Sequence, residues 1–194
     1  MARPLALSLP NLISILRILM VPLIVSLMLG KDYDLAFALF VVAGVSDAVD
    51  GYIAKRFDMR TELGAYLDPI ADKALLVCVY ITLGVQGQMA QVLVTLVVAR
   101  DLLIIGAVML SYFIGHPLRI APLMLSKLNT AAQIIVAALM LAALGLVPAL
   151  MPAVVPGEWI VAATTILSGF AYFLAWFASI SAWDIARRPP GGPA

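Results

Sequence analysis

The chain has 194 residues, of which 64% are hydrophobic and only 12% are charged, and its mean hydropathy is +1.09. A soluble domain has nearly half of its residues apolar and about a quarter charged, so this composition excludes a soluble globular enzyme and a disordered chain. The formal net charge of +1 provides no field that would attract nucleic acid. The composition therefore indicates an integral membrane protein.

Six apolar segments follow one another along the chain, each about as long as a membrane-spanning helix. We expect them at residues 12–29, 35–55, 65–85, 92–114, 128–147 and 160–185. Lipid offers no partners to backbone groups, and no barrel-like alternation is present, so all six segments are expected to be α-helices. The expected fold is all-α, a polytopic membrane protein with six transmembrane helices in one domain over residues 1–188.

The connecting and terminal segments leave little room for anything else. Residues 86–91 and 151–157 are expected to be short uncharged loops. Residues 1–11 are either a short interfacial segment or a frayed terminus. The proline- and glycine-rich residues 189–194 are expected to be a disordered tail.

Basic residues gather at alternate ends of the predicted spans. The richer set of ends carries Arg3, Lys55, Arg56, Arg60, Arg119, Lys127, Arg187 and Arg188, whereas the other set carries only Lys31, beside Asp32 and Asp34, and Glu158. The positive-inside rule places the richer set in the cytoplasm. Both termini are then cytoplasmic, as an even number of spans requires.

Aspartates lie where lipid would exclude them. Within or at the ends of the predicted spans are Asp47, Asp50, Asp68, Asp72 and Asp101. One ionised side chain at mid-span costs on the order of 2.5–3.5 kcal/mol, so their retention calls for a reason. Asp47 and Asp50 are spaced i, i+3, and Asp68 and Asp72 are spaced i, i+4, so each pair shares one stripe of its helix.

The short link over residues 57–63 predicts that the two helices are antiparallel neighbours. Four carboxylates would then converge near the cytoplasmic surface and repel one another unless cations lie between them. Magnesium prefers oxygen ligands and is usually shared with substrate phosphates, and a two-metal arrangement suits four carboxylates. Gly51 and Gly64 would leave room for a phosphate to approach the backbone.

Two other interpretations of these aspartates stay open. They could form structural salt bridges with Lys55, Arg56 and Lys73. They could also serve as an ion relay in a cation transporter, although a relay is expected to spread across the membrane depth rather than to cluster at one end of two helices. Arg17, inside the first span, either snorkels to the interface or supports the site.

The stretch from Asp47 to Asp72 resembles the motif of the CDP-alcohol phosphatidyltransferases, which is D-x-x-D-G-x-x-A-R, eight residues, then G-x-x-x-D-x-x-x-D. Every specified position matches except Lys55, where the family has Arg. Lysine keeps the positive charge but lacks the bidentate fork of arginine. Residues 10–17 also resemble the first-helix pattern of the bacterial phospholipid branch.

The resemblance implies a six-helix membrane core, usually dimeric, at the cytoplasmic face of a bacterial inner membrane or its equivalent. It implies transfer of a phosphatidyl group from CDP-diacylglycerol to an alcohol, with release of CMP and with Mg²⁺ or Mn²⁺ as cofactor. By the resemblance Asp47, Asp50 and Asp68 would bind metal. Asp72 would be a further ligand or the catalytic base. The CDP moiety would lie against Asn11, Gly51, Ala54, Lys55 and Gly64.

Arg100-Asp101 and the stretch over residues 126–133 resemble the eukaryotic-type cardiolipin synthases. In phosphatidylglycerophosphate synthases, Arg-Glu and Lys-Thr are expected in place of Arg100-Asp101 and Asn129-Thr130. The preferred acceptor is therefore phosphatidylglycerol, and the alternative is glycerol 3-phosphate. Its phosphate needs a cationic partner, for which Arg100, Arg119 and Lys127 are the candidates. Arg100 has a second interpretation, in which it pairs with Asp101 or with a motif aspartate.

Overall fold

The computed structural model describes the backbone of residues 9–56, 62–113 and 124–187, and within these the side chains of residues 15–47, 49, 73–106 and 124–177. This part of the chain forms six α-helices and one short 3₁₀-helix. They are α1 (Leu9–Leu29), α2 (Tyr33–Arg56), α3 (Glu62–Val85), α4 (Gln91–Phe113), α5 (Met124–Gly145), η1 (Pro148–Leu150) and α6 (Met151–Arg187). The all-α prediction is confirmed for the described residues.

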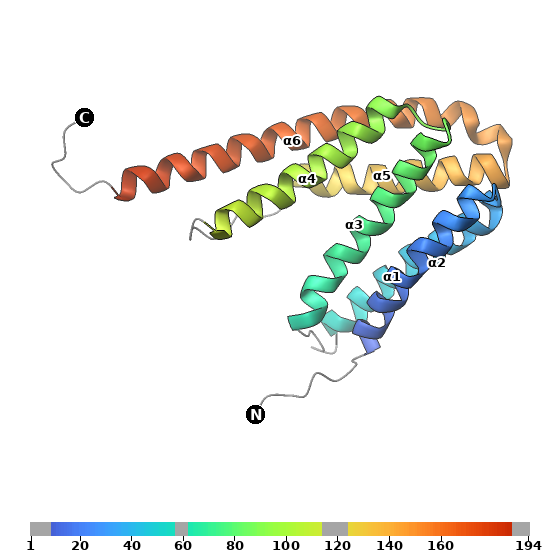
Figure 1. Ribbon diagram of the computed structural model, residues 1–194, viewed down its shortest axis with the longest axis horizontal. Coiled ribbons are helices and arrows are strands. Elements are labelled where there is room, and N and C mark those ends of the chain that lie inside the picture. The colour runs from blue at the N-terminus through green and yellow to red at the C-terminus, as the bar shows by residue number, and fades with distance from the viewer. Residues whose placement is uncertain (1–8, 57–61, 114–123, 188–194) are drawn as a thin grey trace.

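The helices form two groups of three that diverge from a common end (Figure 1). α1, α2 and α3 make one group and α4, α5 and α6 the other, and the connections α1–α2, α3–α4 and α5–α6 all lie where the groups meet. α1 packs against both α2 and α3, while the backbones of α2 and α3 are not in close contact along their described residues. The expected antiparallel neighbours are thus not in backbone contact over this length, and both pack on α1.

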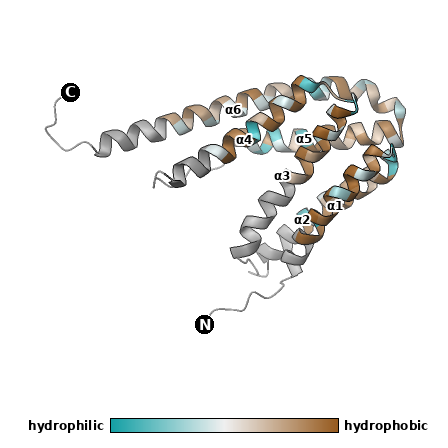
Figure 2. Ribbon diagram, viewed as in Figure 1, coloured by the Kyte–Doolittle hydropathy of each residue, from teal (hydrophilic) through white to brown (hydrophobic). Residues whose placement is uncertain are grey.

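The described helices are apolar over most of their length, and hydrophilic residues occur near the connections and in the middle of α4 beside α5 (Figure 2). Among the described residues, two stretches are long and apolar enough to cross a membrane, Met124–Gly145 and Pro148–Phe177. Shorter apolar stretches occur at Ile15–Leu29 and Lys73–Val85. The membrane character predicted from composition is therefore visible in the helices.

The main core lies where α1, α2, α3 and α5 meet. Its fully buried side chains include Ile24 and Met28 of α1, Leu83 of α3, and Met140 and Leu141 of α5. Other large apolar side chains are exposed, for example Leu19 on α1, Leu103 on α4 and Phe170 on α6. Water would penalise such an exposed apolar surface, whereas lipid tails would not.

Residues 151–157 are helical, so the prediction of a loop there was wrong. α6 begins at Met151 and runs without interruption to Arg187. Pro152 lies in its first turn, where the missing N–H removes no intrahelical hydrogen bond. A Cβ on Gly157 would lie 2.8 Å from the Val136 Cγ2 atom, so this glycine permits close packing of α6 on α5. Pro152 therefore marks the start of a helix and Gly157 a contact between helices, rather than a turn.

The connection between α1 and α2 is tied to the end of α3. Lys31 adopts a left-handed backbone conformation with φ of 66°, which closes the C-terminus of α1. The Gln86 side chain donates from Nε2 to the Met28 carbonyl oxygen at 2.6 Å and accepts a hydrogen bond from the Tyr33 hydroxyl at 3.2 Å. These contacts hold the common end of the two helix groups together.

We expect Gly145→Ala to destabilise the fold by about 1–3 kcal/mol, because a new methyl group would overpack a tight contact. A Cβ at Gly145 would lie 2.6 Å from the Tyr33 carbonyl carbon, at the place where the end of α5 meets the start of α2. Gly106→Ala is the matched control, because a Cβ there meets no atom of the described residues within 4 Å. In detergent, the melting temperature of purified Gly145→Ala should fall below that of wild type. That of Gly106→Ala should rise, since alanine favours a helix more than glycine does.

Candidate active site

The two halves of the aspartate motif lie on α2 and α3, at the helix ends that residues 57–61 connect. Because both stretches are helical, the i, i+3 and i, i+4 spacings place each pair of aspartates on one helix stripe. The side chains of Asp50, Asp68 and Asp72 lie outside the described residues. The same holds for the candidates for binding CDP, which are Asn11, Gly51, Ala54, Lys55 and Gly64.

Asp47 is the motif aspartate whose side chain the structure describes. Its Oδ1 atom lies 2.7 Å from Nη1 of Arg17 on α1. The Arg17 side chain is 1% exposed and that of Asp47 is 39% exposed. Of the two interpretations of Arg17, snorkelling to the interface is therefore wrong, and support of the aspartate site agrees with the contact. Burying an ionised pair between apolar helices costs free energy of desolvation, which only close contact between the two charged groups can offset.

A groove with a volume of about 290 Å³ extends from this ion pair. Its walls come from α1, α2, α3 and α5, and they are almost entirely apolar. Phe40 and Gly44 line it from α2, Leu76 from α3 and Ile134 from α5. Arg17 and Asp47 supply the charged groups of the lining. The groove therefore combines an acidic and basic end with a hydrophobic body.

The donor set at the motif is chemically suited to a divalent cation, because carboxylate oxygens are the ligands that Mg²⁺ prefers. Arg17 engages Oδ1 of Asp47, and the Asp47 side chain is still 39% exposed, so it is not enclosed by this contact. Among the described side chains no group of three Asp, Glu, His or Cys residues could hold a metal ion. The other three candidate ligands lie outside that set.

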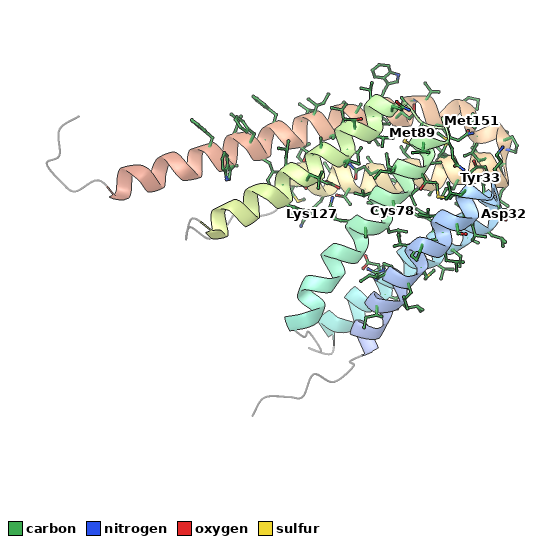
Figure 3. The ribbon with its side chains drawn as sticks, viewed as in Figure 1. Asp32, Tyr33, Cys78, Met89, Lys127 and Met151 are labelled. Atoms are coloured by element: carbon green, nitrogen blue, oxygen red, sulfur yellow. The ribbon has the colours of Figure 1, made fainter. Side chains whose placement is uncertain are left out.

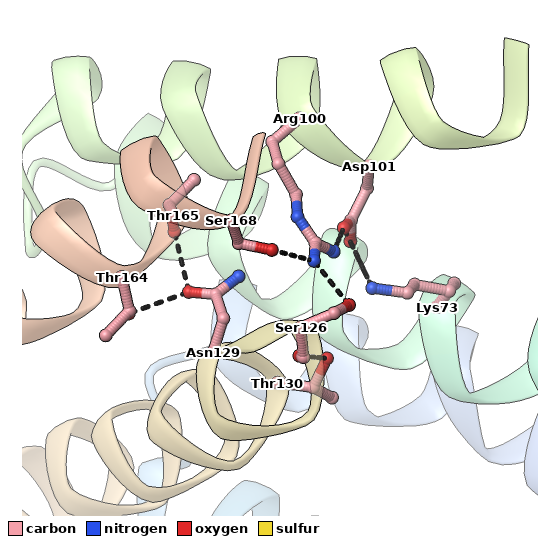
Figure 4. Close-up of polar contacts among 9 residues, drawn as sticks. All are labelled: Lys73, Arg100, Asp101, Ser126, Asn129, Thr130, Thr164, Thr165 and Ser168. Atoms are coloured by element: carbon pink, nitrogen blue, oxygen red, sulfur yellow. Dashed lines mark hydrogen bonds and ion pairs between the residues drawn. The ribbon is translucent and has the colours of Figure 1, made fainter. Parts of the chain in front are cut away.

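Arg100 lies in a buried polar network that connects four helices (Figure 4). It is 4% exposed and donates from Nη1 to Oδ1 of Asp101 at 2.7 Å. Its Nη2 atom donates to the hydroxyl groups of Ser126 on α5 and Ser168 on α6, both at 2.6 Å. Asp101 also accepts two hydrogen bonds from Nζ of Lys73 on α3, each 2.8 Å long. The pairing of Arg100 with Asp101 is thus observed.

The polar residues that open α5 tie this helix to its neighbours. The Asn129 amide oxygen accepts hydrogen bonds from the hydroxyl groups of Thr164 and Thr165 on α6, at 2.8 and 2.9 Å. The Tyr80 hydroxyl on α3 donates to the backbone carbonyl of Gln133 at 3.1 Å. Asn129 and Gln133 are fully buried. The stretch that resembles cardiolipin synthases therefore forms an interhelical contact.

The remaining acceptor candidates differ in their surroundings. Lys127 lies near the start of α5 with an exposed side chain, away from the common end that Tyr33 marks (Figure 3). Arg119 lies outside the described residues. The three cationic candidates are thus not shown to form one cluster.

Sequence reasoning missed the partners of two charged residues. It paired neither Arg17 with Asp47 nor Lys73 with Asp101. A usable signal was present, since each of these charges stands in or beside an apolar run and needs a partner there. The identity of each partner depends on which helices pack together, and local spacing does not encode that.

The helices and the motif define the class of protein. The sequence model of the CDP-alcohol phosphatidyltransferases matches residues 7–179, and the chain belongs to this family. It is 34% identical over 152 residues to the cardiolipin synthase (CMP-forming) of Rattus norvegicus, with 70% of this chain and 50% of the relative covered. It is also 34% identical over 176 residues to the CDP-diacylglycerol--glycerol-3-phosphate 3-phosphatidyltransferase of Rickettsia typhi, with 87% and 96% covered.

A cardiolipin synthase (CMP-forming) / mitochondrial hydrolase fusion protein of Schizosaccharomyces pombe is 35% identical over 183 residues. The alignment covers 87% of this chain and 31% of that relative. The chain thus spans half or less of the length of these two cardiolipin synthase relatives, but nearly the whole length of the Rickettsia typhi protein.

Proposed function

We propose that this protein transfers a phosphatidyl group from CDP-diacylglycerol to an alcohol and releases CMP. The observation that supports this most directly is the Arg17–Asp47 pair at the charged end of an apolar groove. Such a site suits a lipid whose charged head group and acyl chains must be held together. Membership of the phosphatidyltransferase family supports the same reaction and argues against a cation transporter.

In the proposed reaction, the acceptor hydroxyl oxygen attacks the β-phosphorus of CDP-diacylglycerol. A new P–O bond forms, the anhydride P–O bond breaks, and CMP leaves with the electron pair. Asp72 takes the proton of the acceptor hydroxyl as general base. The CDP moiety lies against the residues that the family motif assigns to it, namely Asn11, Gly51, Ala54, Lys55 and Gly64.

We place Mg²⁺ or Mn²⁺, as two ions, with Asp47, Asp50, Asp68 and Asp72 as ligands. When bound, the ions would neutralise charge on the diphosphate and on the departing CMP. Phosphoryl transfer depends mainly on positioning and electrostatics, so a rigid set of carboxylates suits it. Arg17 contributes by holding Asp47 from the neighbouring helix.

The acceptor we propose is phosphatidylglycerol, which would make the protein a cardiolipin synthase, and glycerol 3-phosphate is the alternative. Both names occur among the relatives, so they do not separate the two. We assign the acceptor phosphate to Arg100, Arg119 and Lys127. Among the described residues the Nε atom of Arg100 is buried and has no hydrogen-bond partner, so it is an unused donor beside the proposed acceptor site.

The test is to incubate the purified protein with CDP-diacylglycerol and either phosphatidylglycerol or glycerol 3-phosphate, and to identify the lipid product by mass spectrometry. Cardiolipin supports the preferred acceptor. Phosphatidylglycerophosphate shows that glycerol 3-phosphate is the acceptor and retains the proposed reaction. Absence of both lipid products and of CMP overturns the proposed reaction.

We further propose that all six helices span the membrane as one domain over residues 1–188, between a short N-terminal interfacial segment and a disordered tail at 189–194. Both termini and the active site would face the cytoplasm of a bacterial inner membrane or its equivalent, and the protein would be a homodimer. The gathering of three connections at one end of the helices agrees with this topology (Figure 1). Glu158, expected in a loop, lies on α6.

We expect Gly44→Leu to lower the rate of CMP release from long-chain CDP-diacylglycerol by about 10–100-fold, because an acyl chain displaced from the groove would misplace the diphosphate. A Cβ at Gly44 meets no described atom within 4 Å, and Gly44 lines the groove, so a leucine there can extend into the groove. The measurement compares dioleoyl and dihexanoyl substrates. Gly106→Leu is the control, because a Cβ there also meets no described atom within 4 Å and Gly106 is not in the groove lining. Equal rates for Gly44→Leu and wild type with the long-chain substrate would exclude the groove from substrate binding.

A further inference from the structure

Lys73 directly follows Asp72, the last aspartate of the motif, on α3. Its Nζ atom donates to both carboxylate oxygens of Asp101 on α4, at 2.8 Å each. Asp101 is 3% exposed and Lys73 is 29% exposed. A contact of this length from one charged group to both oxygens of a buried carboxylate restricts both side chains strongly.

The carboxylate of Asp101 is itself held from the other side. Arg100 donates to its Oδ1 atom and is anchored by hydroxyl groups of Ser126 and Ser168 (Figure 4). The Arg100 guanidinium also lies over the ring of Tyr172, 5.8 Å from its centre. Lys73 is therefore bound to a carboxylate that α4, α5 and α6 keep in place.

This contact lies far from the connection that joins α3 and α4. Lys73 is twelve residues before Val85, the last residue of α3, which at 1.5 Å per residue is about 18 Å. The turn after Val85 joins α3 to α4 at the common end, whereas the Lys73–Asp101 contact joins them a second time, far from that turn. Successive helix residues are about 100° apart, so holding Lys73 fixes the rotation of the turn that carries Asp72.

We propose that Lys73 is a positioning residue, which holds α3 through Asp101 so that the motif aspartates keep their orientation. Arg100 clamps Asp101 against α5 and α6 and thereby makes the anchor rigid. This inference rests on the proposed function of the aspartate motif. Groups that orient metal-binding residues typically change metal affinity or activity by about 10–100-fold when removed.

The experiment compares wild type with Lys73→Met, Asp101→Asn, the double variant and Lys73→Arg. The kcat and KM for CDP-diacylglycerol are measured together with Mn²⁺ binding, followed by electron paramagnetic resonance without substrate. Lys31→Asn is the control for loss of a lysine, because Lys31 is exposed in the α1–α2 turn and asparagine tolerates its left-handed backbone.

Lys73→Met and Asp101→Asn are each expected to lower kcat and Mn²⁺ affinity by about 10–100-fold. The double variant is expected to lose no more than the worse single variant, because the two residues act as one unit. Lys73→Arg keeps the ion pair and should have a kcat close to that of wild type. If Lys73→Met does not fold, Lys73→Arg and Asp101→Asn still test the positioning role. The melting temperature serves as the separate measure of stability.

The inference is overturned if folded Lys73→Met or Asp101→Asn keeps wild-type kcat and Mn²⁺ affinity with only a lower melting temperature, or if the losses multiply in the double variant. If wild type itself releases no CMP, the proposed function fails. The Mn²⁺ titration then decides the positioning role alone, with weaker binding by the variants supporting it and equal binding refuting it.

Discussion

Asp47→Asn is expected to release CMP from CDP-diacylglycerol at least about a hundredfold more slowly than wild type, the size of effect seen when one electrostatic contact to a reacting group is removed. Asp47 lies at the charged end of the apolar groove, and the substitution removes its negative charge. Asparagine keeps an oxygen that can accept the hydrogen bond from Arg17, so the variant should remain folded. CMP is measured by liquid chromatography after detergent-solubilised protein and substrate are mixed.

Asp34→Asn is the matched control for this variant. Asp34 lies in the first turn of the same helix, exposed and at the opposite end. Its variant should keep wild-type activity, since its carboxylate is remote from the groove. Wild-type rates for Asp47→Asn would remove Asp47 from the site and with it the metal-binding interpretation of the motif.

Arg17→Met is the second variant with a large expected effect, a loss of about 10–100-fold in kcat, as is typical when a partner of a metal-binding group is removed. Methionine retains much of the apolar stem, which is 1% exposed, but lacks the guanidinium that holds Asp47. Without this partner Asp47 gains rotamer freedom and carries an uncompensated charge. Steady-state kinetics together with a melting curve separate the two consequences.

Arg17→Lys provides the graded comparison, because lysine keeps the charge and loses the planar fork. Its kcat should lie between those of wild type and Arg17→Met. Leu19→Ala is the control on the exposed side of α1, and it should leave kcat unchanged. A kcat for Arg17→Met equal to that of wild type would show that the ion pair only stabilises the fold.

Hydrophobic patterning predicted most of the helical architecture, since a run of about 20 apolar residues has few alternatives in lipid. The predicted segments agree with α1 to α5 within a few residues at each boundary. The motif also predicted the family correctly, because the spacing of carboxylates and glycines is specific to one chemistry. Local pattern was sufficient wherever a single helix decides the outcome.

The errors arise where packing between helices decides. Pro152 and Gly157 are typical of a turn, yet both lie in α6. Pro152 is in the first turn of the helix, and Gly157 lets the helix pack closely against Val136 of α5. The partners of Arg17 and Lys73 lie on other helices, 30 and 28 positions along the chain. A sequence shows that such charges need partners, but only the three-dimensional arrangement identifies them.

The candidate acceptor site illustrates the same limit. Arg100 stands out as a charge in an apolar run, and the sequence left two roles open for it. The structure shows its hydrogen bonds to Asp101, Ser126 and Ser168, and among the described residues its buried Nε atom has no hydrogen-bond partner. Its anchoring is therefore observed, and its acceptor role stays a proposal.

The most direct test of the central claim is CMP release from CDP-diacylglycerol by the purified protein in phospholipid vesicles, with Mg²⁺ or Mn²⁺ and then with excess chelator. If the aspartate motif holds the divalent cations that the reaction needs, CMP is released with either metal. Release stops after chelation and recovers when metal is restored. CMP release that continues unchanged in chelator would contradict the metal site. No CMP under any of these conditions, with an acceptor present, would contradict the proposed reaction.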